Sequence, residues 1–264
     1  MQHIQNATYL TRTSDMTGDS GDESRLGVDE LRDLYAYPVE LGAPWVRVNF
    51  ASSIDGAVSI EGSSAALGTP ADKTVFDVLR ELADVIVVGA GTVRAEDYGG
   101  ARSDEARREW RLARGLAAVP PIAVVSARAS IDPTSRLLTD TSVAPLILTC
   151  AAAPAENKQR LADAGAEVLE VGADTIATTD ILSTLDGLGL RRILCEGGPA
   201  LFGQLIADDA VDELCLTISP LLTGGTSRRI AVSPSGVRTP MARAHVLADD
   251  DGTLLTRWVR ARQA

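Results

Sequence analysis

Short apolar runs alternate with amphipathic stretches along most of the chain. Residues 45–51 are β-branched and aromatic and predict a strand, and residues 71–83 repeat apolar side chains at the spacing of one helical face. Further strands are predicted at residues 84–89, 121–126, 145–150, 166–171, 191–198 (which ends in a turn) and 212–220. Further helices are predicted at residues 103–117, 155–164, 178–189 and 199–207. This alternation predicts an α/β fold with a mostly parallel sheet flanked by helices.

The two ends of the chain depart from this alternation. Residues 244–260 form two alternating apolar and polar stretches around an Asp-Gly pair, which predicts an antiparallel C-terminal hairpin. Residues 1–43 form an acidic arm that we expect to be partly disordered, because residues 13–24 are polar and glycine-containing. Within this arm, residues 28–37 predict a short helix that docks on the folded part. We therefore expect one folded domain over residues 44–262.

Composition narrows the class of protein. The formal net charge is −11, which disfavours general binding to nucleic acid or to an anionic membrane surface. No run of 18 apolar residues is present, and no basic region followed by an apolar core opens the chain. The three cysteines predict buried thiols in a reducing compartment, so we expect a cytoplasmic protein. Two histidines and no CxxC pattern exclude a zinc deaminase, and we expect no metal.

Ligands of open α/β sheets bind beyond the carboxyl ends of the strands, where four segments carry unusual residues. The first, Ser52–Gly56, offers the Asp55 carboxylate, although an ordinary turn explains it equally well. The second holds Gly89, Gly91 and Thr92 between a strand and a helix, where backbone N–H groups favour phosphate. A simple tight turn is the alternative, because Arg94 takes the place of the third glycine of a GxGxxG motif.

The other two segments add charge at the same edge. Glu196 ends a buried strand and precedes Gly197 and Gly198, and burying its carboxylate is costly unless the group is paired or used. Ser126 and Arg128 follow another strand with no acid beside them, which suits a ribose 2′-phosphate and favours NADPH over NADH. A solvated loop arginine is the alternative interpretation of Arg128.

In this order, the motifs SSIDG, VIVVGAGTVRAED, ILCEGGPALFGQL and DELCLTISPLLTGG resemble the reductase domain of the bifunctional riboflavin-biosynthesis deaminase/reductase. They are also similar to stand-alone actinobacterial pyrimidine reductases. The resemblance covers roughly residues 45–260. It implies a dihydrofolate-reductase-like fold, an NADPH cofactor, a homodimer and the activity of a 5-amino-6-(5-phosphoribosylamino)uracil reductase.

The resemblance also implies roles for individual residues. Thr92 matches a threonine that contacts NADPH, and Ser126 matches a position near the 2′-phosphate. The segment that wraps the cofactor phosphates corresponds to Gly197, Gly198, Ala200 and Leu201. The substrate-side positions correspond to Ser64, Arg80 and Glu196, and Asp55 lines the site.

Two stretches depart from the family pattern. The family usually has a proline and a leucine–threonine pair after its two acids, but Glu96–Arg102 reads EDYGGAR. A tryptophan often found two residues after the Ser64 position is Ala66 here. Both changes fall near the expected substrate or nicotinamide end, so they bear on the substrate more than on the cofactor.

The resulting hypothesis is the reduction of a ribosylamino-pyrimidine 5′-phosphate by NADPH. Arg80 and Arg102 would hold the substrate phosphate or uracil, Glu196 would hydrogen-bond the pyrimidine, and Asp55 would relay a proton. A dihydrofolate or other pterin reductase on the same scaffold is the first alternative, because pterins share a similar hydrogen-bonding edge. The second is a non-catalytic NADPH-binding module.

Overall fold

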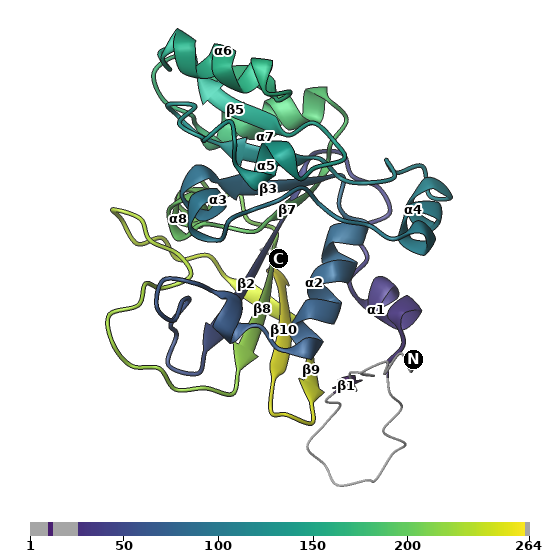
Figure 1. Ribbon diagram of the computed structural model, residues 1–264. Helices are drawn as coiled ribbons and strands as arrows, with labels where there is room; N and C mark the ends of the chain where they lie inside the picture. The colour runs from purple at the N-terminus through teal and green to yellow at the C-terminus, as the bar shows by residue number, and fades with distance from the viewer. Residues whose placement is uncertain (1–9, 13–25, 262–264) are drawn as a thin grey trace, which may run out of the picture.

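In the described residues, which are 10–12 and 26–261 of this computed structural model, ten strands form one continuous sheet. The strands are β1 (Leu10–Arg12), β2 (Trp45–Ser53), β3 (Val85–Gly89), β4 (Ile122–Val125), β5 (Leu146–Cys150), β6 (Glu167–Gly172), β7 (Arg192–Cys195), β8 (Glu213–Ser219), β9 (Met241–Asp249) and β10 (Leu254–Arg260). Their order across the sheet is β1-β9-β10-β8-β2-β7-β3-β4-β5-β6 (Figure 1). The seven strands from β8 to β6 are parallel, and β10, β9 and β1 are antiparallel additions at one edge.

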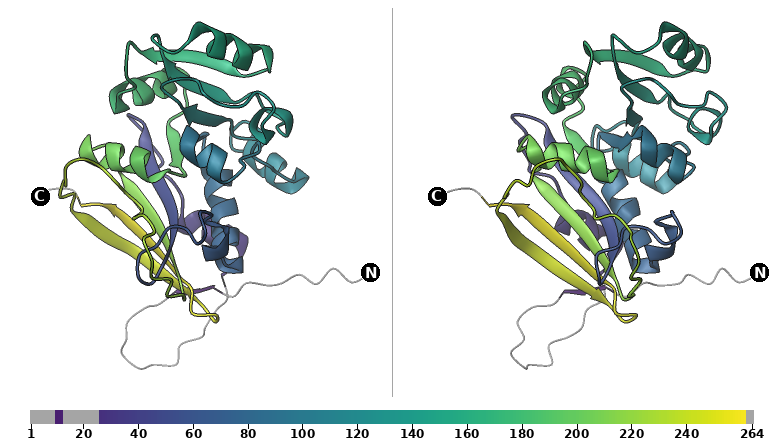
Figure 2. Two further views of the ribbon diagram at one scale, coloured as in Figure 1. Left: turned by 60° about the vertical axis from the view of Figure 1, so that its left-hand side comes forward. Right: turned by 90° about the vertical axis from the view of Figure 1, so that its left-hand side faces the viewer.

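The helices are α1 (Val28–Leu34), α2 (Pro70–Leu82), α3 (Ala90–Ala95), α4 (Glu105–Leu112), α5 (Arg136–Thr139), α6 (Ala155–Asp163), α7 (Thr178–Gly187) and α8 (Pro199–Ala207), with a 3-10 turn η1 (Ala65–Leu67). None of the helices in the described part of the chain is long and apolar enough to cross a membrane. The two views of Figure 2 show that the sheet twists strongly between its antiparallel edge and the edge formed by β5 and β6.

Two apolar cores lie on opposite faces of the sheet, because successive strand residues point to opposite sides. Ile86 and Val88 of β3 face a core that includes residues of α1 and α2. Val85 and Val87 of the same strand face a second core, built with residues of α7 and α8. Burial on both faces explains why the central strands are uninterrupted apolar runs in the sequence. The predicted mostly parallel sheet, flanked by helices and extended by an antiparallel hairpin, is confirmed.

The hairpin expected at residues 244–260 is present as β9 and β10. Gly252 has a φ of +90° in its connecting turn, a conformation that glycine adopts without strain. The helix expected over residues 103–117 is shorter and ends at Leu112. The sequence patterns did not predict β1, α5 or η1, which are all short, and the helix expected after the glycine turn at Gly89 and Gly91 is the short α3. The segment 13–24 lies outside the described residues.

Helix α1 is anchored to the domain by its apolar face and by its C-terminal carbonyl groups. Leu31 and Tyr35 are each only 1% exposed in the core next to α2. Arg47 donates to the Tyr35 carbonyl at 2.6 Å, and Arg257 donates to the carbonyls of the neighbouring residues. The Glu213 carboxylate pairs with both arginines, at 2.6 Å and 2.8 Å. The buried charge network therefore orients two guanidinium groups toward the end of α1.

Candidate active site

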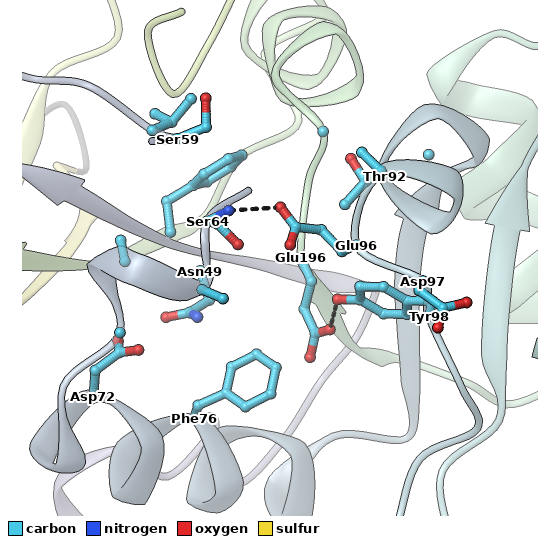
Figure 3. A pocket seen from close by; sticks show the side chains of 18 of the residues that line it. Asn49, Ser59, Ser64, Asp72, Phe76, Thr92, Glu96, Asp97, Tyr98 and Glu196 are labelled. Atoms are coloured by element: carbon cyan, nitrogen blue, oxygen red, sulfur yellow. Dashed lines mark hydrogen bonds between the residues drawn. The ribbon is translucent and has the colours of Figure 1, made fainter. Parts of the chain in front are cut away.

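A cleft of about 1220 Å³ opens at the carboxyl ends of the central strands. Its walls come from β2, the first two turns and the last turn of α2, the turn from β3 into α3, and the turn from β7 into α8. The loop from residue 58 to residue 65 and the segment 226–228 close another side. The cleft therefore lies where open parallel sheets bind their ligands. Figure 3 shows its side chains at close range.

The two glycine turns singled out in the sequence meet at one wall of this cleft. The backbone N–H of Gly89 donates to the Gly197 carbonyl at 2.8 Å. A Cβ atom on Gly198 would lie 2.5 Å from Oγ1 of Thr92, and one on Gly197, where φ is +93°, would lie 2.8 Å from the Phe50 ring. Glycine is therefore required at both positions, by close approach and, at Gly197, also by backbone conformation.

Most of the predicted cofactor residues line the cleft at this wall. They are Gly89, Gly91, Thr92, Gly198, Ala200 and Leu201. A Cβ atom on Gly91 would meet no protein atom within 4 Å, so this position leaves open space beside the start of α3. Gly198 caps α8, whose first turn contains Pro199 and presents free backbone N–H groups.

Glu196 and Arg80 form a paired group on the floor of the cleft. Arg80 donates to both carboxylate oxygens of Glu196, from Nε and Nη2, at 2.7 Å each. Tyr98 donates its hydroxyl to Oε2 of the same carboxylate (Figure 3). Both oxygens of the Glu196 carboxylate are therefore engaged by protein donors. The side chain of Glu196 is 3% exposed and that of Arg80 is 21% exposed.

The Glu196 carboxylate stabilises the charged form of the Arg80 guanidinium. Burial alone would lower the pKa of the Arg80 guanidinium, but the Glu196 carboxylate raises it above its ordinary value. Burial, reinforced by the negative charge of Glu196, raises the pKa of Tyr98 well above its ordinary value. The guanidinium of Arg80 also lies 4.3 Å from the centre of the Phe76 ring. Arg80 is consequently held in one orientation at the base of the cleft.

The other predicted substrate residues lie at its rim. Ser64 lines the cleft, and its backbone N–H donates to Glu96 at 2.8 Å, which fixes the loop after β2. Arg102 also lines the cleft, but its side chain is 74% exposed and pairs with Asp140 at 2.6 Å. Arg102 therefore has its own carboxylate partner.

Asp55 does not belong to the lining of the cleft. Its carboxylate accepts hydrogen bonds from the Ser53 hydroxyl at 2.5 Å and from the backbone N–H groups of Thr223 and Gly224 at 3.2 Å and 2.7 Å. These bonds, led by the Ser53 hydroxyl, lower the pKa of the Asp55 carboxyl to about 2. Asp55 thus ties the turn after β2 to the loop after β8, and it is ionised at neutral pH.

Ser126 and Arg128 also lie outside the lining of the cleft. The pairing of Gly89 with Val125 places Ser126 beside the first glycine turn, one strand further along the sheet. The Ser126 hydroxyl is buried and accepts from the backbone N–H of Ser130 at 3.3 Å. Arg128 is exposed, and its guanidinium has no protein partner among the described residues. The two residues are therefore near the glycine turns but not at the floor of the cleft.

The lining residues that were not anticipated from the sequence include Asn49, Asp72, Phe76 and Tyr98. Asp72, Phe76 and Arg80 follow one another at a spacing of four on α2, so a helical projection through Arg80 would have found the first two. Tyr98 lies in the stretch where the sequence departs from the family pattern. Asn49 lies inside a strand, and its sequence position gives no comparable signal.

Comparison with known proteins places these features in a family. The family model of the RibD C-terminal domain matches residues 44–255. The chain is 34% identical to the 2,5-diamino-6-ribosylamino-4(3H)-pyrimidinone 5′-phosphate reductase of Archaeoglobus fulgidus over 69% of its length and 83% of that protein. It is 27% identical to the riboflavin biosynthesis protein RibD of Bacillus amyloliquefaciens over 85% of its length, which spans 60% of that relative.

A solved structure agrees with the sequence comparisons. The pyrimidine reductase-like protein of Corynebacterium diphtheriae superposes with a TM-score of 0.78 at 26% identity. The match covers 88% of this chain and 99% of that one. The resemblance inferred from the ordered motifs is thereby confirmed. The chain belongs to the family of the RibD C-terminal domain, the reductase domain of riboflavin biosynthesis.

Proposed function

We propose that this protein is an NADPH-dependent reductase of a ribosylamino-pyrimidine 5′-phosphate in riboflavin biosynthesis. Family membership supports the reaction class, because the Archaeoglobus relative is named for the reduction of such a compound. One structural observation carries the proposal: a single cleft joins a glycine wall suited to a nucleotide to a charged floor formed by Arg80 and Glu196. A reductase needs this combination, since cofactor and substrate must meet within one site.

The glycine wall fits a nicotinamide dinucleotide. The open space at Gly91, the close approach of Gly198 to Thr92 and the capped start of α8 together form a surface that backbone N–H groups can line. We propose that Gly89, Gly91, Thr92, Gly197, Gly198, Ala200 and Leu201 hold the cofactor, which supplies hydride when it is bound. Ser126 and Arg128 are proposed to receive the 2′-phosphate, because the Arg128 guanidinium has no carboxylate partner.

On the substrate side, the chain orients the reacting molecule. Glu196 fixes Arg80 through two hydrogen bonds, from Nε and Nη2, which hold the guanidinium in the lining of the cleft, where it can donate to a ligand. Lys73 and Arg228 also line the cleft, and no carboxylate of the described residues pairs with either. They are better placed to take a substrate phosphate than Arg102, which pairs with Asp140. Ser64 would contact the substrate from the rim.

We further propose a cytoplasmic homodimer. All three cysteines are buried free thiols, which suits a reducing compartment. Ile54, Leu222 and Leu254 are 61%, 77% and 38% exposed, at the same end of the neighbouring strands β2, β8 and β10. Apolar side chains grouped in this way favour contact with another copy of the chain.

The function is tested by following nicotinamide oxidation on the purified protein. We expect turnover with NADPH and the pyrimidine substrates, and a lower kcat/KM with NADH by roughly 10- to 150-fold, since one charge-assisted hydrogen bond would be lost. Dihydrofolate serves as the competing substrate. Turnover of dihydrofolate alone would replace the proposal with a pterin reductase, and no turnover of any candidate would indicate a binding module. Equal efficiency with NADH would remove Ser126 and Arg128 from the cofactor site.

A further inference from the structure

The long connection between β8 and β9 includes a segment, residues 226–232, that contacts two sides of the site. We call this segment the strap, and its first three residues line the cleft. The half-buried Ser227 hydroxyl accepts from the backbone N–H groups of Val58 and Ser59, at 3.2 Å and 3.3 Å. It also pairs with the Ser59 hydroxyl at 3.4 Å. The strap is thereby joined to the start of the loop 58–65.

The other end of the strap lies on α8, the helix that begins at the glycine wall. The backbone N–H of Val232 donates to the Pro199 carbonyl at 2.9 Å, in the first turn of α8. One turn further along α8, a Cβ atom on Gly203 would lie 2.1 Å from the Val232 carbonyl oxygen, so only glycine allows this close approach. Ile230 and Ala231 pack against the apolar core that contains the buried residues of α8. The strap therefore joins α8 to the loop 58–65.

A second contact holds the far end of the loop 58–65. The Ser63 hydroxyl and the backbone N–H of Ser64 both donate to the Glu96 carboxylate, at 3.1 Å and 2.8 Å (Figure 3). Glu96 directly follows α3, the other helix that begins at the glycine wall. Between the two contacts, the loop pairs only locally, through a bridge between Ile60 and Ser63. The position of the loop over the cleft is consequently set by Glu96 at one end and by Ser227 at the other.

We infer that Ser227 is a positioning residue, which holds the loop 58–65, and with it Ser64, at the rim of the cleft. The strap fixes Ser227 from α8, so the substrate side of the site is positioned from the cofactor side. The inference rests on the proposed function, because it takes Ser64 as a substrate contact. Without the Ser227 hydroxyl, substrate binding would have to order a looser loop, and that ordering weakens binding.

The test compares the wild type with Ser227→Ala in steady-state kinetics with NADPH and 2,5-diamino-6-ribosylamino-4(3H)-pyrimidinone 5′-phosphate. The KM for the pyrimidine should rise by roughly 3- to 10-fold, the size expected when a neutral hydrogen bond is lost. The kcat and the NADPH dissociation constant should change by less than about twofold, because Ser227 acts on substrate binding alone. Ser227→Thr keeps the hydroxyl and should restore KM. Ser233→Ala is the matched control, since the Ser233 hydroxyl donates to the Ser235 carbonyl just beyond the strap.

A second variant displaces the strap from its other end. Gly203→Ala places a Cβ atom against the Val232 carbonyl, so the strap must move away from α8. It should raise the KM for the pyrimidine in the wild-type background and add little in the Ser227→Ala background, because both changes act through one segment. Equal factors in the two backgrounds would show that the strap does not link α8 to the loop 58–65 and would overturn the inference.

Hydrogen exchange measured by mass spectrometry examines the loop without any ligand. Ser227→Ala should speed exchange at the amides of Val58 and Ser59, while those of β3 keep the wild-type rate. Unchanged exchange at these two amides, or an unchanged KM, would overturn the inference and leave the proposed function intact. A joint loss of melting temperature, kcat and NADPH affinity would also overturn it, because Ser227 would then be a general structural residue. A wild type that reduces no pyrimidine phosphate would remove both.

Discussion

Tyr98 departs from the family pattern, and its hydroxyl donates a hydrogen bond to the Glu196 carboxylate. The sequence locates the departure, because a tyrosine stands where the family usually has a proline. It does not reveal the contact, because the partner carboxylate of Glu196 is 98 positions away in the chain. Arg80 and Glu196 are likewise predicted as site residues, whereas their bidentate pairing depends on how α2 packs across β7. Long-range side-chain geometry of this kind is beyond what a local pattern can predict.

Replacing Tyr98 with phenylalanine tests its role as a donor to Glu196. The change keeps the ring but leaves a buried carboxylate oxygen with one donor fewer, so the free energy of unfolding should fall by about 1.5–3 kcal/mol. The kcat/KM for substrate should fall as Arg80 loses its fixed orientation, while cofactor affinity should stay near the wild-type value. Tyr37→Phe is the matched control, since the Tyr37 hydroxyl donates to the Ile193 carbonyl. Denaturant titration measures the stability of each variant, and steady-state kinetics measures its turnover. Equal effects of Tyr98→Phe and Tyr37→Phe on turnover would refute this role.

Two roles of Asp55 can be distinguished: a structural carboxylate, as its contacts indicate, and the proton relay suggested by the sequence. Its pKa of about 2 is below the ordinary 3.8, so the fold favours the ionised form. Its contribution to stability is therefore complete above pH 4 and lost as the pH falls toward 2. The difference in urea midpoint between wild type and Asp55→Asn should be constant from pH 8 to pH 4 and shrink below pH 4. The pH–rate profile should keep its shape in Asp55→Asn. Loss of one limb of that profile in the variant would support the role of Asp55 as a proton relay.

At the scale of the element, the central strands were predictable because burial on both faces makes them continuous apolar runs. The helices over residues 71–83, 155–164, 178–189 and 199–207 were predictable because one face of each is apolar. The short elements α3, α5 and η1 span three to six residues, too few to show a period. Asp72 escaped notice because a single acid in the first turn of a helix usually satisfies the helix end.

The meeting of the two glycine turns yields a prediction for Gly198→Ala. The added Cβ would lie 2.5 Å from Oγ1 of Thr92, so α3 or α8 must shift. Such overpacking should lower the free energy of unfolding by about 1–3 kcal/mol and weaken cofactor binding. Combining it with Thr92→Ala removes the clashing atom and should restore much of the melting temperature. Gly187→Ala, where a Cβ meets no atom within 4 Å, is the matched control. An unchanged melting temperature in Gly198→Ala would show that the two turns are not in close contact.

At the scale of the whole molecule, one sheet brings distant segments to a common edge. Residues of the site come from β2, α2, α3 and the start of α8, and the sheet order places β2, β7 and β3 side by side. The family pattern predicted which segments contribute, and the sheet order explains why they meet. Beyond this edge, the antiparallel strands and α1 extend the same fold away from the cleft.

The exposed apolar side chains near β8 and β10 give a prediction for assembly. Light scattering after size exclusion should give twice the mass of one chain at micromolar concentration. Leu222→Asp places a charge among these side chains and should shift the protein toward monomer, because desolvating an unpaired charge is costly. Leu188→Asp, at an exposed leucine that follows α7, is the control and should remain dimeric. A wild type that is monomeric throughout would contradict the proposed dimer.

We propose that the cleft brings a reduced nicotinamide and a ribosylamino-pyrimidine phosphate together for direct hydride transfer. The most direct measurement follows deuterium from C4 of the labelled nicotinamide of NADPH into the isolated product by mass spectrometry and NMR. We expect one deuterium per product molecule, at C1′ of a ribitylamino side chain, with the pyrimidine ring unlabelled. Deuterium on the heterocycle, or NADPH oxidation that leaves the ribosylamino group unreduced, would contradict it.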